Sequence, residues 1–207
     1  MNLRFERIGS TIAALAASVL LAAALPGPGG TEGSEALVGQ FLVATPEMGD
    51  PRFAETVILM VRHDKTGALG IVINRPVEER SLASLMAALG DTDSDARGTV
   101  RIFAGGPVEP AVGFVVHSAE YHRPETIAVD DRVAVTSSAT ILRDMGHGAG
   151  PAKALVAFGY TGWGPGQLET EMSEHSWFTE PEDHKLLFDA DRGIVWKEAL
   201  ARRSRDL

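Results

Sequence analysis

Apolar residues come in short runs of strand length along most of the chain, and turn residues separate the runs. Residues 37–44, 56–62 and 68–73 are three such runs, and the last two are apolar at nearly every position. Between these two lie residues 63–67, where Gly67 can adopt the positive φ that closes a loop of four or five residues. The pattern therefore predicts a β-hairpin whose strands are covered on both faces.

Residues 81–90 have the period of a helix instead. Ser81 is a good N-cap, four apolar side chains follow at i, i+3, i+4 and i+7, and Gly90 can end the helix. Further strands are predicted at 100–104, 112–117, 127–129, 133–135 and 155–160, and further helices after Ser137 or Ser138, at 167–172 and at 194–200. Residues 105–110 and 130–132 are predicted to join two more hairpins. Adjacent hairpins with helices between them favour a single α+β domain over a doubly wound parallel sheet.

The amino-terminal segment has the pattern of a targeting sequence. Two arginines precede an uncharged, Ala-rich run at 8–25, and Ala24 ends a triplet of small residues. We therefore expect residues 1–24 to be a signal peptide or an N-terminal anchor, residues 25–36 a flexible linker, and residues 37–207 the folded domain. A signal at 1–24 implies a periplasmic or membrane-tethered protein. The alternative is a start site assigned too far upstream, which implies a cytoplasmic one.

Composition and charge exclude several classes of protein. The 207 residues include no cysteine, so disulfide scaffolds, thiolate nucleophiles and cysteine-ligated metal sites are ruled out. Nineteen Lys and Arg against 28 Asp and Glu give a formal net charge of −9. Affinity for nucleic acid depends largely on clustered basic side chains, so no direct nucleic-acid binding is expected. Contact with a membrane is expected only through the N-terminal segment, if it stays uncleaved.

Five ordered motifs give the chain a family resemblance. They are residues 39–46 (GQFLVATP), 50–53 (DPRF), 67–76 (GALGIVINRP), 105–108 (GGPV) and 159–169 (GYTGWGPGQLE). Trp177, residues 186–189 (LLFD) and Trp196 follow in the same order. With these motifs the chain resembles the AlgH/YqgE family of bacterial proteins, also called UPF0301, over nearly its whole length from residue 39.

The resemblance implies a compact α+β domain, a strongly coiled and mostly antiparallel sheet with short flanking helices. It implies no reaction, because the family has no established enzymatic activity and takes its name from a proposed regulatory role in alginate production. Family members usually begin near the first motif and look cytoplasmic, whereas this chain carries residues 1–36 ahead of it. Export would conflict with a cytoplasmic regulatory role.

The motifs also provide a candidate interaction surface for an unidentified protein or small ligand. It consists of Asn74, Arg75, Gly105, Gly106, Pro107, Tyr160, Trp163 and Gln167. Successive glycine amides at 105–106 can bind an anion, and Arg75 can bind a carboxylate. Each feature also has a structural interpretation: a tight turn for the glycines, an internal ion pair for Arg75, and core packing for Trp163. We expect a noncatalytic interaction or regulatory domain.

The alternative is an uncharacterised hydrolase or metal-assisted enzyme. It would use His117, His122 or His175 with nearby carboxylates, and it requires at least two of these side chains to converge within about 4 Å in a concave pocket. No G-x-S-x-G, H-x-x-E-H or phosphate-loop pattern occurs in the sequence. Accordingly we assign no catalytic residue, cofactor or metal ligand.

Overall fold

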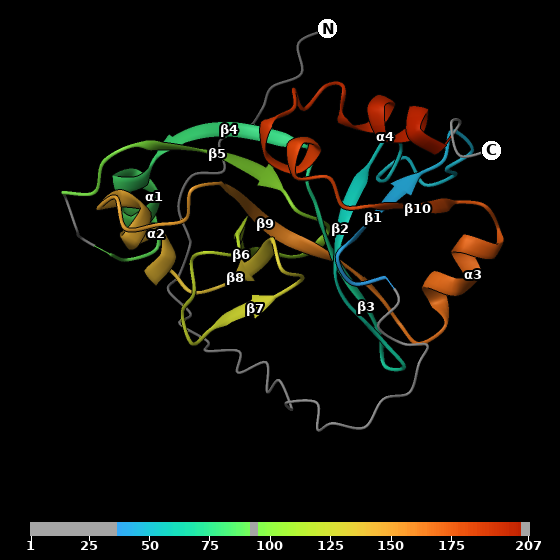
Figure 1. Cartoon of the computed structure of the whole chain (residues 1–207), viewed down its shortest axis with the longest axis horizontal. Helices are drawn as coiled ribbons and strands as arrows, with labels where there is room; N and C mark the ends of the chain where they lie inside the picture. Colours follow the sequence, from blue (N-terminus) through green and yellow to red (C-terminus); the bar gives the residue numbers. More distant parts are fainter. Residues whose placement is uncertain (1–36, 92–94, 204–207) are drawn as a thin grey trace, which may run out of the picture.

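A curled sheet of ten strands carries most of the residues that the computed structural model describes, which are 37–91 and 95–203 (Figure 1). The strands are β1 (Gln40–Ala44), β2 (Val57–Asp64), β3 (Gly67–Val72), β4 (Pro76–Ser81), β5 (Thr99–Ala104), β6 (Val108–Ser118), β7 (Thr126–Ala128), β8 (Val133–Thr136), β9 (Ala154–Trp163) and β10 (Trp177–Pro181). The helices are α1 (Leu82–Ala88), α2 (Thr140–Gly146), α3 (Gln167–Ser173), the π-helix η1 (Lys185–Asp189) and α4 (Val195–Arg203).

Strand β9 joins the two halves of this sheet, because its two ends have different partners. Its C-terminal end pairs with β3, which continues through β2 and β1 to β10. Its N-terminal part pairs with β5 on one edge and with β6 on the other, and β6 continues to β8 and β7. The β5–β9 pair is parallel and the other recorded pairs are antiparallel. The predicted α+β class with a mostly antiparallel coiled sheet is confirmed.

The first strands are buried on both faces, as their apolar runs predict. Along β2, Val57 and Leu59 belong to the main core between the halves of the sheet, whereas Ile58 and Met60 belong to a second core under α3. Because successive side chains of a strand point to opposite faces, a strand between two cores must be apolar at every position. The β2–β3 hairpin is confirmed, although its turn has only two residues between Asp64 and Gly67.

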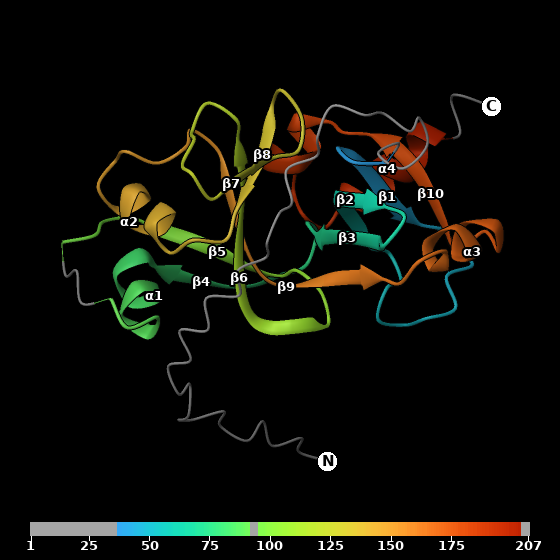
Figure 2. The same ribbon diagram turned by 90° about the horizontal axis from the view of Figure 1, so that it is seen from below.

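Short helices cover both ends of the sheet. Figures 1 and 2 show α1 and α2 side by side at one end and α3 at the opposite end. Helix α1 begins as predicted, with the Ser81 hydroxyl accepting a hydrogen bond of 3.2 Å from the Ser84 amide, and it buries Leu82, Leu85 and Met86. No helix in the described part of the chain is long and apolar enough to cross a membrane.

One local prediction was wrong. Strands β5 and β6 do not form a hairpin around residues 105–110, because β9 lies between them and pairs with both. After β3 ends at Val72, Pro76 is the first residue of β4 and lies opposite Phe103. Proline is tolerated there because β4 pairs only with β5 and has a free edge. The predicted targeting segment and linker, residues 1–36, lie outside the described residues.

Candidate functional site

The glycines of the GGPV motif make a close backbone crossing over β9. A Cβ atom on Gly105 would lie 2.3 Å from the carbonyl oxygen of Gly159, and one on Gly106 would lie 2.2 Å from the Tyr160 backbone. The Gly105 amide donates a 2.7 Å hydrogen bond to the Phe158 carbonyl. This amide is therefore committed to the protein itself. The crossing carries the chain from β5 on one side of β9 to β6 on the other.

Asn74 and Arg75 hold the segment that leads into β2. The Asn74 side chain accepts a 3.0 Å bond from the Val57 amide and donates a 2.9 Å bond to the Glu55 carbonyl. The Arg75 guanidinium donates to the Ala54 carbonyl at 2.9 Å and to the Thr56 hydroxyl at 2.8 Å. Arg75 forms neither an internal ion pair nor another recorded side-chain contact among the described residues.

Trp163 and Gln167 belong to a separate cluster at the start of α3. The indole N–H groups of Trp163 and Trp177 donate to the same Glu171 oxygen, at 2.9 and 2.8 Å. Gln167 donates to the other Glu171 oxygen at 2.9 Å. The two indole bonds, from β9 and β10, fix α3 against the sheet, whereas the Gln167 bond lies within the helix. Trp163 is buried, as its structural interpretation expected.

The predicted interaction surface therefore divides into two groups along β9. Gly105 and Gly106 form the crossing, and Arg75, which follows Asn74, adjoins it because its carbonyl accepts from the Ala104 amide at 2.9 Å. The half-buried Tyr160 lies beside them, where its ring packs edge to face on Phe114. Trp163 and Gln167 lie with α3. Pro107 and Gln167 are exposed, and the binding role of the whole set stays a prediction.

The three histidines of the enzymatic alternative do not share a recorded contact. His117 is fully buried in β6, where Nε2 contacts the Thr136 hydroxyl at 2.9 Å and Nδ1 the Ser118 carbonyl at 3.0 Å. Burial lowers the pKa of His117, although the Ser118 carbonyl and the charge of Glu120 oppose this. His122 is exposed in a loop, and His175 is exposed just after α3, at the far end of the sheet from α2 (Figure 1).

Among residues 37–91 and 95–203, no group of three or more His, Asp or Glu side chains is arranged to hold a metal ion. His117 also has both ring nitrogens occupied by protein groups, and the ring packs edge to face on Tyr121 with centroids 5.3 Å apart. A base must reach a substrate proton directly or through one water molecule. His117 is in no position to do so in this conformation.

The described structure has a groove of about 440 Å³ beside the parallel pair of strands β5 and β9. It lies between strands β4, β5 and β9 on one side and residues 187–192 on the other. Its apolar lining continues the main core and includes Phe103, Leu155, Leu187 and Phe188. Its charged residues are Glu79, Arg101, Asp189 and Arg192. The accessible surface of the groove is more polar than apolar, and its volume lies within the roughly 300 to 1,000 Å³ of pockets that bind small molecules.

Arg192 is the buried charge of this groove. It is only 7% exposed, and its guanidinium donates to the carbonyls of Leu187 and Ala190, each at 2.9 Å. Burial lowers its pKa, and the charge of Arg101 lowers it further, against a smaller opposing effect of Asp191 and Asp189. The other charged side chains are paired: Arg101 with Glu79 at 2.9 Å, and Asp189 with Lys153.

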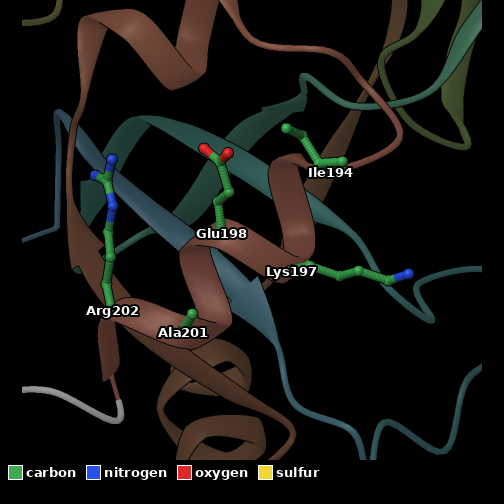
Figure 3. A pocket seen from close by; sticks show the side chains of 5 residues that line it. All are labelled: Ile194, Lys197, Glu198, Ala201 and Arg202. Carbon is green, nitrogen blue, oxygen red and sulfur yellow. The ribbon is translucent and has the colours of Figure 1, made fainter.

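A second hollow lies along the outer face of α4 and has a different character (Figure 3). Its lining side chains all come from one helix or the residue before it: Ile194, Lys197, Glu198, Ala201 and Arg202. Figure 3 shows Lys197 and Arg202 pointing in different directions. Groups that do not converge cannot hold a ligand in one orientation, so the groove beside Arg192 is the better candidate site.

Comparison with known proteins places this fold and its motifs in one family. The AlgH-like family profile matches residues 41–207. The chain belongs to the AlgH-like family. It is 44% identical to a UPF0301 protein of Sphingopyxis alaskensis over 168 residues, which cover 81% of this chain and 89% of the relative. It is also 44% identical to a UPF0301 protein of Rhodospirillum rubrum over 170 residues, 82% of this chain and 88% of the relative.

Two solved structures resemble this AlgH-like chain. The solution structure of AlgH from Pseudomonas aeruginosa has a TM-score of 0.69 and 36% identity, and the match covers 84% of this chain and 92% of that one. A crystal structure of a Corynebacterium diphtheriae protein has a TM-score of 0.66 at 19% identity, covering 83% and 88%, and it shares the fold alone. The resemblance inferred from the five motifs is confirmed.

The groove of this AlgH-like chain was not predicted from its sequence. Phe103, Leu155 and Arg192 are far apart in the sequence, and each lies in a segment that looks ordinary by itself. The LLFD motif at 186–189 was the one available signal, because it supplies Leu187, Phe188 and Asp189 to the groove wall. The motif alone does not predict a groove, because the opposite wall forms only where β9 lies between β5 and β6. Local sequence patterns do not reveal that arrangement.

Proposed function

We propose that this AlgH-like chain is a noncatalytic interaction or regulatory domain, and that it binds its ligand in the groove between β5, β9 and residues 187–192. The observation that carries this proposal is the continuity of the groove lining with the core. Phe103, Leu155 and Leu187 are almost fully buried, yet they line a space open to a ligand. A groove that combines partly exposed apolar side chains with charged groups favours binding of a small molecule or of one side chain of a protein partner.

The arrangement of polar groups supports binding rather than catalysis. A nucleophile or a general base needs a partner that activates or orients it. The groove lining contains no histidine, serine or tyrosine, and the candidates His117, His122 and His175 are not among its residues. Its carboxylates, Glu79 and Asp189, are occupied by ion pairs with Arg101 and Lys153.

Site-specific photocrosslinking in cells tests this proposal. A diazirine amino acid replaces Thr99, which is exposed at the rim of the groove, and in a control it replaces Ala128, which is exposed on β7. We expect an adduct of defined mass from position 99 and none of that mass from position 128. A second substitution, Ala152→Trp, fills the groove from an exposed lining position and should abolish the adduct. Equal labelling at both positions, or labelling that survives Ala152→Trp, would refute the groove as the site.

We also propose that residues 1–24 direct export or anchoring of this domain. The support is the composition of the segment, an uncharged Ala-rich run after two arginines. The mass of the native protein in a periplasmic fraction tests the proposal. A mass lacking residues 1–24 indicates cleavage, and the full mass in the membrane fraction indicates a tether. Recovery from the cytoplasm alone contradicts both.

A further inference from the structure

The Arg192 side chain is a buried cation whose recorded hydrogen-bond partners are all backbone carbonyls. Nε and Nη2 donate to the carbonyl of Ala190, and Nη1 donates to the carbonyls of Leu187 and Ile73. An arginine has five N–H donors, so one Nη2 hydrogen is left over. Within residues 37–91 and 95–203, no carboxylate lies within ion-pair distance of Arg192.

A buried charge without an ion pair is costly, because the low dielectric of the interior does not replace its hydration. Carbonyl oxygens satisfy the N–H groups, but they do not neutralise the charge. Arg101 lies near enough to lower the pKa of Arg192 by repulsion, which adds to the effect of burial. Asp189 and Asp191 act on Arg192 only through space, and Asp189 is already paired with Lys153. Arg101 and Asp189 have ion-pair partners, so among the described residues Arg192 is the charge of the groove lining without one.

The apolar residues of the groove favour a different part of a ligand from the part that the charge of Arg192 favours. Phe103 and Leu155 are only 5% and 4% exposed and present almost no surface, but Val100, Met145 and Phe188 also line the groove and are partly exposed. These apolar side chains favour contact with the apolar part of a ligand, and they offer no hydrogen bonds to a strongly hydrated ion. A bare inorganic anion would fill only part of the 440 Å³ and would leave these apolar side chains in contact with water.

We propose that the groove binds a small amphipathic molecule, with an anionic head group at Arg192 and Arg101 and an apolar body against Met145 and Phe188. This inference rests on the proposed function, since it names the ligand class for the same groove. A carboxylate or a phosphate head meets the same chemistry, because a guanidinium binds either with parallel N–H···O bonds. Charge and apolar area must occur in one molecule for both parts of the groove to be used.

Titrations followed by two-dimensional amide NMR on the full chain test the inference. The probes are 4-phenylbutyrate, its uncharged amide 4-phenylbutyramide, 2-phenylethyl phosphate, and inorganic phosphate. The backbone amides of Ala152, Ala154 and Ala190 line the groove and report binding there. We expect the carboxylate or the phosphate ester to bind about tenfold more tightly than the amide, a ratio typical of one charge-assisted hydrogen bond. Comparing the two anionic probes identifies the preferred head group, and inorganic phosphate alone should leave these amides unshifted.

Two arginine substitutions locate the anionic head. Arg101→Gln removes a charge whose side chain is 52% exposed and whose pair with Glu79 is worth little to stability, so the variant should fold. It should weaken the anionic probe several-fold and leave the amide unchanged. Arg62→Gln, at a 47% exposed arginine on β2, is the matched control and should change neither. Arg192→Met should remove the preference for the anion, provided circular dichroism shows a folded chain.

The outcomes separate this inference from the proposed function. If acid and amide bind in the groove with equal affinity, or if Arg101→Gln affects both equally, the anionic ligand class is wrong while the groove stays a binding site. If no probe shifts the groove amides, the ligand class is also wrong. The crosslinking at position 99 then decides whether the groove is a binding site. Preference for the anion that is lost in Arg101→Gln, with Arg62→Gln unchanged, supports the inference.

Discussion

The carbonyl oxygen of Gly106 lies 2.3 Å from the place that a Cβ atom on Gly159 would occupy. Gly159 also has a φ of +75°, which side chains of L residues rarely adopt. Two glycine motifs about fifty residues apart are therefore needed at one point, where the link between β5 and β6 crosses β9. The glycines have this structural role whatever the domain binds.

Gly159→Ala should destabilise the fold strongly. Gly148→Ala is the matched control, because Gly148 has a φ of +73° with nothing within 4 Å of its Cβ position. The control should lose about 1–2 kcal/mol from the left-handed backbone alone. Gly159→Ala should lose about 1–3 kcal/mol more, since the crossing must open. Urea unfolding of both variants measures the difference, and equal losses would show that the crossing is not tight.

Glu171→Ala should loosen α3 from the sheet. The substitution removes the acceptor of both indole N–H groups, so the donors of two buried tryptophans lose their partner at a cost of about 1–3 kcal/mol. Hydrogen exchange of the α3 amides and the fluorescence of Trp163 and Trp177 should both change. Glu174→Ala, at an exposed residue just after α3, is the control. Unchanged exchange in Glu171→Ala would mean that apolar packing alone holds this helix.

His117 should make stability fall in mild acid. Burial lowers its pKa, so the unfolded chain binds a proton more readily than the folded protein. The stability tied to neutral His117 is therefore complete above the ordinary pKa of 6.5 and is lost as pH falls through the folded pKa. His117→Gln should cost about 1–3 kcal/mol at pH 8 and reduce the loss of stability between pH 7 and pH 5. His122→Gln, at an exposed position, should keep the wild-type profile, and thermal unfolding across this range compares the three proteins.

Glu182 should have the opposite dependence on pH. Burial raises its pKa, with help from the charges of Asp130 and Asp183, although Arg132 and His184 oppose the shift. The folded state then binds the proton more tightly, so stability from this group is present at low pH and lost as pH rises through the folded pKa. Glu182→Gln mimics the protonated acid. Its melting temperature should match wild type near pH 4 and exceed it at pH 7; a lower value at pH 7 would mean that the 2.5 Å pair with Arg132 outweighs the cost of burial.

The sequence was sufficient for elements that depend on local pattern. The continuous apolar run of β2, the cap at Ser81 and the start of the helix at Gln167 follow from the hydrophobic pattern and turn chemistry, and the structure confirms them. Strand β4 was missed because it is a charged edge strand without an apolar run, and η1 was missed because five residues carry no helical period. The β5–β6 pair was wrong because β9, about fifty residues later, takes the place between them.

The candidate site was harder to predict than the fold for a related reason. Conspicuous residues such as Arg75 and Trp163 use their polar atoms within the protein. Arg192 looks like one more charge in a polar segment, and only tertiary structure shows it buried beside Phe103 and Leu155. The cost of burying that charge cannot be read from the residues around it.

Native mass spectrometry tests most directly whether this domain binds without catalysing. The protein is purified gently from its own cells, alongside the Ala152→Trp variant whose groove is filled. The account predicts a small molecule that stays bound to the wild-type chain, keeps its mass after prolonged incubation and is absent from the variant. A compound retained equally by Ala152→Trp, or one that the wild-type chain converts into a product of different mass, would contradict it.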